Sequence, residues 1–214
     1  MIPSKNMVFV IDDDASVRKG LKRLFSTADY ECELFPSAAE FLARPPHPGP
    51  ACLVVDVQMP EVSGIELQNA LLQRRREEQL IFITGHGNIP MCAQAMKAGA
   101  VDFLAKPFEP DELLQCVERA LMRSIEQRRR AAEKTRTRGL LDSLTPREFE
   151  VMHLLTTGML NKQVGGELGM AEKTVKVHRG NVMRKLGITS VAELVHLVEK
   201  AQVPSPEKLR TSAA

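Results

Sequence analysis

The sequence lacks paired cysteines and long apolar segments, and each absence excludes a class of protein. Its cysteines are scattered at positions 32, 52, 92 and 116, without the close spacing that zinc sites and redox motifs require. Near the N-terminus, the apolar run Met7–Ile11 is too short for a signal peptide or a membrane span. We therefore expect free thiols in a reducing compartment, and a cytoplasmic protein without membrane contact.

Length and charge indicate two folded domains with different partners. The chain has 214 residues, 43% hydrophobic and 26% charged, which is typical of a folded protein long enough for two domains. Residues 1–117 contain 11 basic and 16 acidic residues, whereas residues 118–138 contain 8 basic and 3 acidic ones. A further basic excess in residues 171–187 is suited to a phosphate backbone, although a solvated helix face has the same composition.

The first half of the sequence alternates short apolar stretches with amphipathic ones, which predicts a repeated strand-helix unit. The strand candidates span residues 7–11, 31–35, 52–55, 80–83 and 101–104. The third and fourth are almost entirely apolar, as expected for a parallel sheet covered on both faces. Ser37 and Asn88 mark the starts of two helices, and the proline-rich segment 44–50 indicates a loop.

The second half shows no further strand pattern. The last helix of the first domain, from Asp111, has an apolar stripe that gives way to arginines, so it is expected to extend into a charged helical linker, residues 126–139. Capping-box pairs begin at Thr145 and Ser190, and four short helices account for the residues between 145 and 200. The expected units are an α/β domain (1–125), the linker, an all-α domain (140–200) and a flexible tail (201–214).

Chemically reactive side chains follow four of the predicted strands. They are Asp12, Asp13 and Asp14 after the first strand, Asp56 after the third, Thr84 after the fourth and Lys106 after the fifth. Ligands of open parallel sheets bind outside the carboxyl ends of the strands, so these side chains are expected to share one pocket. Clustered carboxylates repel each other unless a hard cation such as Mg²⁺ neutralises them.

This set of residues fits phosphoryl transfer. Asp56 is the candidate nucleophile, Lys106 stabilises charge on the transferred oxygens and Thr84 binds them through its hydroxyl. Taken singly, the residues have ordinary alternatives, since Asp13 or Asp14 could cap a helix, Thr84 could form a turn and Lys106 could be solvated. Their joint placement at four strand ends favours the shared site.

The segments VFVIDDD, LVVDVQMPEVSGIEL, FITGHG and AVDFLAKPF resemble the receiver domains of two-component response regulators. The resemblance covers residues 1–125 and implies a flavodoxin-like (βα)5 fold. It also implies that Asp56 accepts a phosphoryl group from a sensor histidine kinase. Asp13 would bind Mg²⁺ directly and Asp12 partly through water, while Asp56 and the Gln58 backbone carbonyl complete the metal site, with Mn²⁺ as a substitute.

The same resemblance assigns a switch. Phe103 would turn inward when Thr84 moves toward the phosphoryl group, although ordinary core packing is the alternative for this residue. The Lys106-Pro107 peptide bond would be cis. The protein would then be no enzyme, apart from taking part in its own phosphotransfer and dephosphorylation.

The segment LTPREFEVMHLLTTGMLNKQVGGELGMAEKTVKVHRGNVMRKLGITSVAELVHLV resembles the LuxR-type helix-turn-helix domain of FixJ/NarL-type regulators. The resemblance implies a four-helix domain whose helix 172–186 enters the major groove of promoter DNA. Val175, Val182 and Leu186 would face the core. The DNA-binding candidates are Lys173, Thr174, Lys176, Val177, His178, Arg179, Asn181 and Lys185. Two departures are Ala171 in place of a capping serine and Gly165-Gly166 inside a helix. Both should weaken the domain locally, and a close crossing of helices is the feature that would compensate.

The last helix carries more apolar residues than one core face needs. They are Ala192, Leu194, Val195, Leu197 and Val198. A dimer contact is one interpretation and an ordinary core is the other. The resemblance implies pairing of the DNA-binding domains through this helix, pairing of phosphorylated receivers around their fourth helix, fifth strand and fifth helix, activation of transcription and contact with RNA polymerase.

Two other functions deserve comparison. A phosphatase of the haloacid-dehalogenase type needs a second aspartate two residues after the nucleophile, where this chain has Gln58. A dinucleotide site is excluded because the first strand opens into aspartates, which repel phosphate. A phosphate-independent regulator, gated by a ligand or a partner protein, stays open as the alternative, although the complete acidic set argues against it.

Overall fold

The computed structural model describes residues 6–85 and 89–201. The chain divides into two compact units, Met1–Arg129 and Arg130–Ala214, and each is described by itself. The predicted tail beyond Ala201 and the predicted helix start at Asn88 lie outside the described residues. Within the described ranges, no helix has the length and apolar character needed to cross a membrane.

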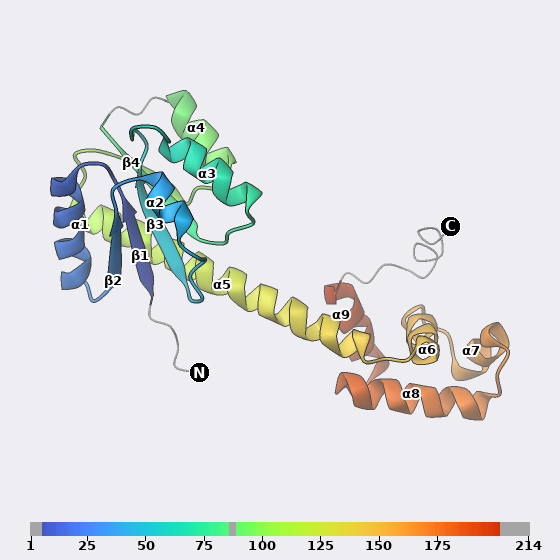
Figure 1. Cartoon of the computed structure of the whole chain (residues 1–214). Helices are drawn as coiled ribbons and strands as arrows, with labels where there is room; N and C mark the ends of the chain where they lie inside the picture. The colour runs from blue at the N-terminus through green and yellow to red at the C-terminus, as the bar shows by residue number, and fades with distance from the viewer. Residues whose placement is uncertain (1–5, 86–88, 202–214) are drawn as a thin grey trace. The chain divides into compact units, whose positions relative to one another are not determined.

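A five-stranded parallel sheet forms the centre of the first unit (Figure 1). Its strands are β1 (Met7–Ile11), β2 (Glu31–Phe35), β3 (Ala51–Asp56), β4 (Gln79–Thr84) and β5 (Asp102–Ala105). They are ordered β2-β1-β3-β4-β5, and every neighbouring pair is parallel. All residues of β3 and β4 are buried, which confirms a sheet covered on both faces. The strand order reverses between β1 and β3. Open parallel sheets generally bind ligands outside the carboxyl ends of the strands at such a point.

Helices cover both faces of this sheet. They are α1 (Ala15–Thr27), α2 (Ala38–Ala43), α3 (Gly64–Gln73), α4 (Ile89–Lys97) and α5 (Pro110–Asp142). One apolar cluster combines sheet residues with α2, α3 and α4, and the other combines them with α1 and α5. The Ser37 hydroxyl accepts the Glu40 N–H, as the sequence predicts. Helix α5 runs without interruption through the segment predicted as a helical linker.

Up to Ala201, where the described residues end, four short helices follow α5, as the sequence predicts. They are α6 (Pro146–Thr156), α7 (Asn161–Leu168), α8 (Glu172–Leu186) and α9 (Val191–Ala201). The capping box of Thr145 and Glu148 is present. At the start of α9 the Ser190 hydroxyl accepts the Glu193 N–H, while the Glu193 carboxylate accepts the Thr189 N–H. One apolar cluster joins all four helices with Leu140 and Leu141 at the end of α5.

The departures from the family pattern have different structural consequences. A Cβ atom on Gly165 would lie 2.7 Å from the Met170 carbonyl oxygen, so α7 can approach this backbone only with glycine at that position. A Cβ atom on Gly166 would meet nothing within 4 Å. Ala171 provides no side-chain cap for α8. The expected local weakening therefore applies to Gly166 and Ala171, whereas Gly165 is required by packing.

The four cysteines are free thiols. Cys52 and Cys116 are buried, and Cys32 and Cys92 are partly buried. Burial raises the pKa of Cys32 and of Cys116 to about 11, and it also raises the pKa of Cys52. These three thiols are therefore held in the protonated, unreactive form at neutral pH.

Candidate phosphoacceptor and DNA-binding sites

Asp12 and Asp56 lie side by side at the carboxyl ends of β1 and β3 and share one cation. The Lys106 Nζ donates to Asp12 Oδ2 over 2.7 Å and to Asp56 Oδ1 over 2.9 Å. Asp12 is 1% exposed and Asp56 6% exposed. Two buried carboxylates that contact the same amine would repel each other without that cation. The structure thus brings together three residues that the sequence placed in one pocket.

The local chain fixes both carboxylates through backbone donors. Asp12 Oδ1 accepts the Asp14 N–H, and Asp56 Oδ2 accepts the Gln58 N–H, each over 2.9 Å. Asp14 itself caps α1 by accepting the Ser16 N–H, so the ordinary helix-cap interpretation applies to this residue. Asp13 is exposed at the rim.

Gly64 is a residue of the site that the sequence reasoning missed. A Cβ atom at this position would lie 2.6 Å from the Asp56 carbonyl oxygen and 3.0 Å from the Phe82 ring. Helix α3 can begin against the end of β3 because glycine occupies this position. The capping box of Ser63 and Glu66 starts α3 at the same point, and its Ser-x-x-Glu spacing was the available sequence signal.

Charge and burial act against each other within the cluster. Burial raises the pKa of Asp56, although its hydrogen bond with Lys106 opposes this shift. Burial also works against the charge on Lys106, but hydrogen bonds with Asp12 and Asp56 raise the pKa of Lys106 above its usual value. Lys106 therefore stays positively charged and balances part of the negative charge of the cluster.

The donor set suits a hard divalent cation in its chemistry. Carboxylate and backbone carbonyl oxygens are the ligands that Mg²⁺ prefers, and a carboxylate oxygen of Asp12 or Asp56 can accept a further bond besides the one described above. In the part of the chain that the structure describes, no three His, Cys, Asp or Glu side chains converge as a ready metal site. A divalent cation at this site would be held by Asp12 and Asp56, with Asp13 and the Gln58 backbone carbonyl as further donors, and would neutralise part of the negative charge.

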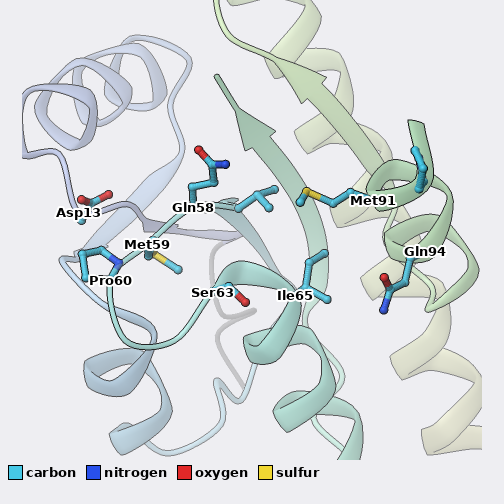
Figure 2. Close-up of a pocket in the computed structure, with 10 residues that line it drawn as sticks. Asp13, Gln58, Met59, Pro60, Ser63, Ile65, Met91 and Gln94 are labelled. Atoms are coloured by element: carbon cyan, nitrogen blue, oxygen red, sulfur yellow. The ribbon is translucent and has the colours of Figure 1, made fainter. Parts of the chain in front are cut away.

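A cavity of about 790 Å³ opens beside the acidic cluster. Figure 2 shows Asp13 and Gln58 at one side of it and Met91 and Gln94, from α4, at the other. The remaining lining residues are Val57, Met59, Pro60, Ser63, Ile65 and Pro90. The cavity therefore lies next to the acidic cluster, since Gln58 in its wall donates its N–H to Asp56.

The predicted switch residues lie at the ends of the neighbouring strands. Thr84 is fully buried at the end of β4, and its carbonyl oxygen accepts the Lys106 N–H over 2.7 Å. Phe103 is partly buried, with its ring centroid 6.2 Å from that of Phe82. The Lys106-Pro107 bond is cis, as expected.

Helix α8 separates an apolar side from a polar one. Val175 and Val182 are fully buried and Leu186 is 4% exposed, which confirms the predicted core face. The candidates Lys173, Thr174, Lys176 and Val177 are exposed, and His178, Arg179 and Asn181 are partly buried. Three of these side chains also have protein partners: Lys176 pairs with Glu172, Arg179 donates to Asn161 and Asn181 accepts from Arg184.

Lys185 is placed differently from the other DNA-binding candidates. Its Nζ donates to Glu148 Oε2 over 2.6 Å and to the Ser143 carbonyl oxygen over 3.1 Å. The Glu148 side chain is only 5% exposed. The ion pair therefore ties the end of α8 to the start of α6, and a DNA contact by Lys185 stays a prediction.

The Glu148–Lys185 pair should make the DNA-binding unit sensitive to acid. Hydrogen bonds with Lys185 and the Thr145 backbone lower the pKa of Glu148 from 4.5 to about 2. A lowered pKa in the folded state means that the stabilisation is present above pH 4.5 and is lost as the pH falls toward 2. We expect Glu148→Gln to be less stable than the wild type at pH 7, with a smaller difference at pH 3. Urea unfolding at pH 7 and pH 3 measures the two differences in stability between variant and wild type. Glu167→Gln, on the exposed side of α7, is the control. An equal loss of stability at both pH values would contradict the assignment.

The fold and the two sites define a class of protein: an acidic receiver-like α/β unit followed by a helix-turn-helix unit for DNA. Comparison with known protein families gives the same two domains. Residues 8–118 match the response regulator receiver domain, and residues 142–198 match the luxR family of bacterial regulatory proteins. The chain belongs to the two-component response regulators with a LuxR-type DNA-binding domain. A sensor kinase and DNA are the partners that this domain combination implies.

Relatives share the whole two-domain arrangement. Nodulation protein W of Bradyrhizobium diazoefficiens is 46% identical over 92% of this chain and 86% of its own length. The response regulator protein TodT of Pseudomonas putida is 40% identical over 91% of this chain and 86% of its own length. Among solved structures, the response regulator StyR is 49% identical, with a TM-score of 0.85 over 92% of this chain and all of that chain.

Proposed function

We propose that the protein is a transcription activator switched by phosphoryl transfer from a sensor histidine kinase to Asp56. The observation that carries the proposal is the shared contact of Asp12 and Asp56 with Lys106 beside an open cavity. In the transfer, an Asp56 carboxylate oxygen bonds to phosphorus and the phosphorus–nitrogen bond of the phosphohistidine breaks. The departing imidazole keeps the electron pair, and Lys106 stabilises charge on the phosphoryl oxygens.

Mg²⁺, or Mn²⁺ in its place, would be held by Asp12, Asp13, Asp56 and the Gln58 carbonyl. When bound, it neutralises charge on the phosphoryl oxygens. Thr84 then binds a phosphoryl oxygen, and Phe103 turns inward as Thr84 moves toward the phosphoryl group. The chemistry is confined to the protein's own phosphorylation and dephosphorylation, so it is not an enzyme that acts on other substrates.

In the second unit, α8 enters the major groove, and its candidate side chains have different roles. Lys173, Lys176 and Arg179 neutralise phosphates or read guanine, and Thr174 and Asn181 bond to phosphates or bases. Val177 is 57% exposed, which suits apolar contact with a thymine methyl group. His178 and Lys185 complete the proposed interface.

The proposed domains are a receiver (1–125), a helical linker (126–139), a DNA-binding domain (140–200) and a tail (201–214). Phosphorylation favours a homodimer paired through α9 and through the surface of α4, β5 and α5. Two apolar side chains on α4 support such a surface, since Ile89 is 86% and Met96 41% exposed. The dimer acts on promoter DNA in the cytoplasm together with RNA polymerase.

Incubation of the full chain with acetyl phosphate and Mg²⁺ tests this function. Intact mass should show one phosphate adduct on the wild type and on Asp111→Asn, which alters an exposed carboxylate at the start of α5, and none on Asp56→Asn. Sedimentation should show dimers in the samples that carry the adduct. The phosphorylated wild type is then used to select a duplex from a random DNA library. A wild type that binds DNA but gains no phosphate would replace this proposal by the phosphate-independent alternative.

A further inference from the structure

The proline-rich loop 44–50 is bound to α5 at the end of the sheet opposite Asp56. The Arg128 guanidinium donates to the carbonyl oxygens of Pro48 and His47 over 2.9 and 2.7 Å. One turn earlier in α5, the Ser124 hydroxyl accepts the Ala51 N–H over 3.2 Å, and Ser124 is 1% exposed. The segment that precedes β3 is therefore held to α5 at three backbone positions.

This loop is also held from the sheet side. Arg76 and Glu78 form an ion pair in which both side chains are less than 5% exposed, and Arg76 donates to the Arg44 carbonyl oxygen. The Arg76 guanidinium lies 4.6 Å from the Phe41 ring centroid, and that of Arg44 lies 4.3 Å from the centroid of Phe9. Contacts on both sides leave the loop little freedom to move independently of β3 and α5.

Strand β3 connects these contacts with the phosphoacceptor. It begins at Ala51, which is bonded to α5, and ends at Asp56, which is bonded to Lys106. Every residue between them is buried. A densely packed strand transmits a displacement rather than absorbing it. A change at Asp56 would therefore be felt at the opposite end of the strand, where α5 is bound.

We propose that Arg128 is a positioning residue that couples phosphorylation of Asp56 to the DNA-binding unit, and this inference rests on the function proposed above. Its two hydrogen bonds fix the loop before β3 to the helix that continues into the second unit. Helix α5 crosses the division between the units at Arg129 and Arg130. The state of β3 thus reaches α5 through Arg128, immediately before that division.

The run Arg128-Arg129-Arg130 provides its own control. Arg128 is partly buried and bonds to backbone carbonyls, whereas Arg129 is exposed and pairs with Glu126 on the same helix. Both carry the same charge. A general electrostatic effect would be shared by the two residues, while a coupling role belongs to Arg128 alone of this pair.

The test compares full-length wild type, Arg128→Ala, Arg128→Lys and Arg129→Ala. Each protein is treated with acetyl phosphate and Mg²⁺, its adduct is quantified by intact mass, and its affinity for the duplex selected above is measured with and without phosphorylation. We expect a wild-type ratio of the two affinities of about 5 to 150, the usual range of coupling between sites. The ratio should fall toward 1 in Arg128→Ala, remain unchanged in Arg129→Ala and recover partly in Arg128→Lys, while the extent of phosphorylation stays the same in all four.

The outcomes separate this proposal from the proposed function. Absence of the adduct from the wild type removes the proposed function and the coupling with it. An unchanged affinity ratio in Arg128→Ala, with the adduct present, overturns the coupling alone. An equal loss in Arg129→Ala, or a loss of phosphorylation in Arg128→Ala, also overturns it. Ser124→Ala is a second variant that keeps the arginine, and it should lower the ratio in the same direction.

Discussion

Lys106→Met is expected to slow phosphorylation of Asp56 by a factor on the order of 10², the usual effect of removing one preorganised electrostatic group. Methionine fills a similar volume but leaves Asp12 and Asp56 without the cation that both contact. The negative charge of the incoming phosphoryl group would then meet two carboxylates that are almost fully buried.

The initial rate of adduct formation with acetyl phosphate and Mg²⁺, followed by intact mass, measures this effect. Lys97→Met is the matched control, because Lys97 lies at the end of α4 and is exposed, and it should leave the rate unchanged. A Lys106→Met rate equal to that of the wild type would show that the lysine contributes to packing and not to charge balance.

Glu78→Ala is expected to destabilise the receiver unit by about 3–5 kcal/mol, the cost of leaving one member of a buried ion pair without its partner. Arg76 would keep its charge inside the protein, with its side chain 4% exposed and stacked on Phe41. Replacing both residues with apolar ones of similar size, as in Arg76→Met with Glu78→Leu, should recover most of the loss.

Urea unfolding of the full chain, followed by circular dichroism, tests the pair through the transition of the first unit. Glu118→Ala, an exposed glutamate on α5, is the control and should change stability by less than about 0.5 kcal/mol. A small effect of Glu78→Ala would mean that water reaches Arg76 in the variant. A double variant as unstable as the single one would assign the stabilisation to packing of these two side chains.

Much of the receiver site follows from the sequence because strand order in a parallel sheet determines where its carboxyl ends meet. The bounds of the five strands were each predicted within one residue, and Asp12, Asp56 and Lys106 lie together as the topology requires. The role of Gly64 was not predicted, and for Gly165 the sequence suggested a close helix crossing without indicating the atom that requires it. Both depend on close contact with a particular carbonyl oxygen, which no local pattern contains.

Basic residues were the hardest to interpret from sequence. From composition alone, Arg128 and Arg129 are indistinguishable. In the structure Arg128 bonds to the loop before β3, whereas Arg129 pairs with Glu126 one turn earlier in α5. Lys185 belongs to the basic stretch of α8, yet its amine is bonded to Glu148. A charged residue shows its role through the acceptor that the fold brings near it, and this acceptor is often distant in sequence.

The distribution of the thiols makes α4 accessible to selective chemistry. Alkylating reagents attack the thiolate, and burial keeps Cys32, Cys52 and Cys116 protonated. Cys92 lies on α4, one residue after Met91, which lines the cavity together with Asp13 and Gln58. A fluorophore or spin label directed to Cys92 would therefore place a native reporter on α4, the helix whose Met91 and Gln94 line this cavity, without an engineered cysteine.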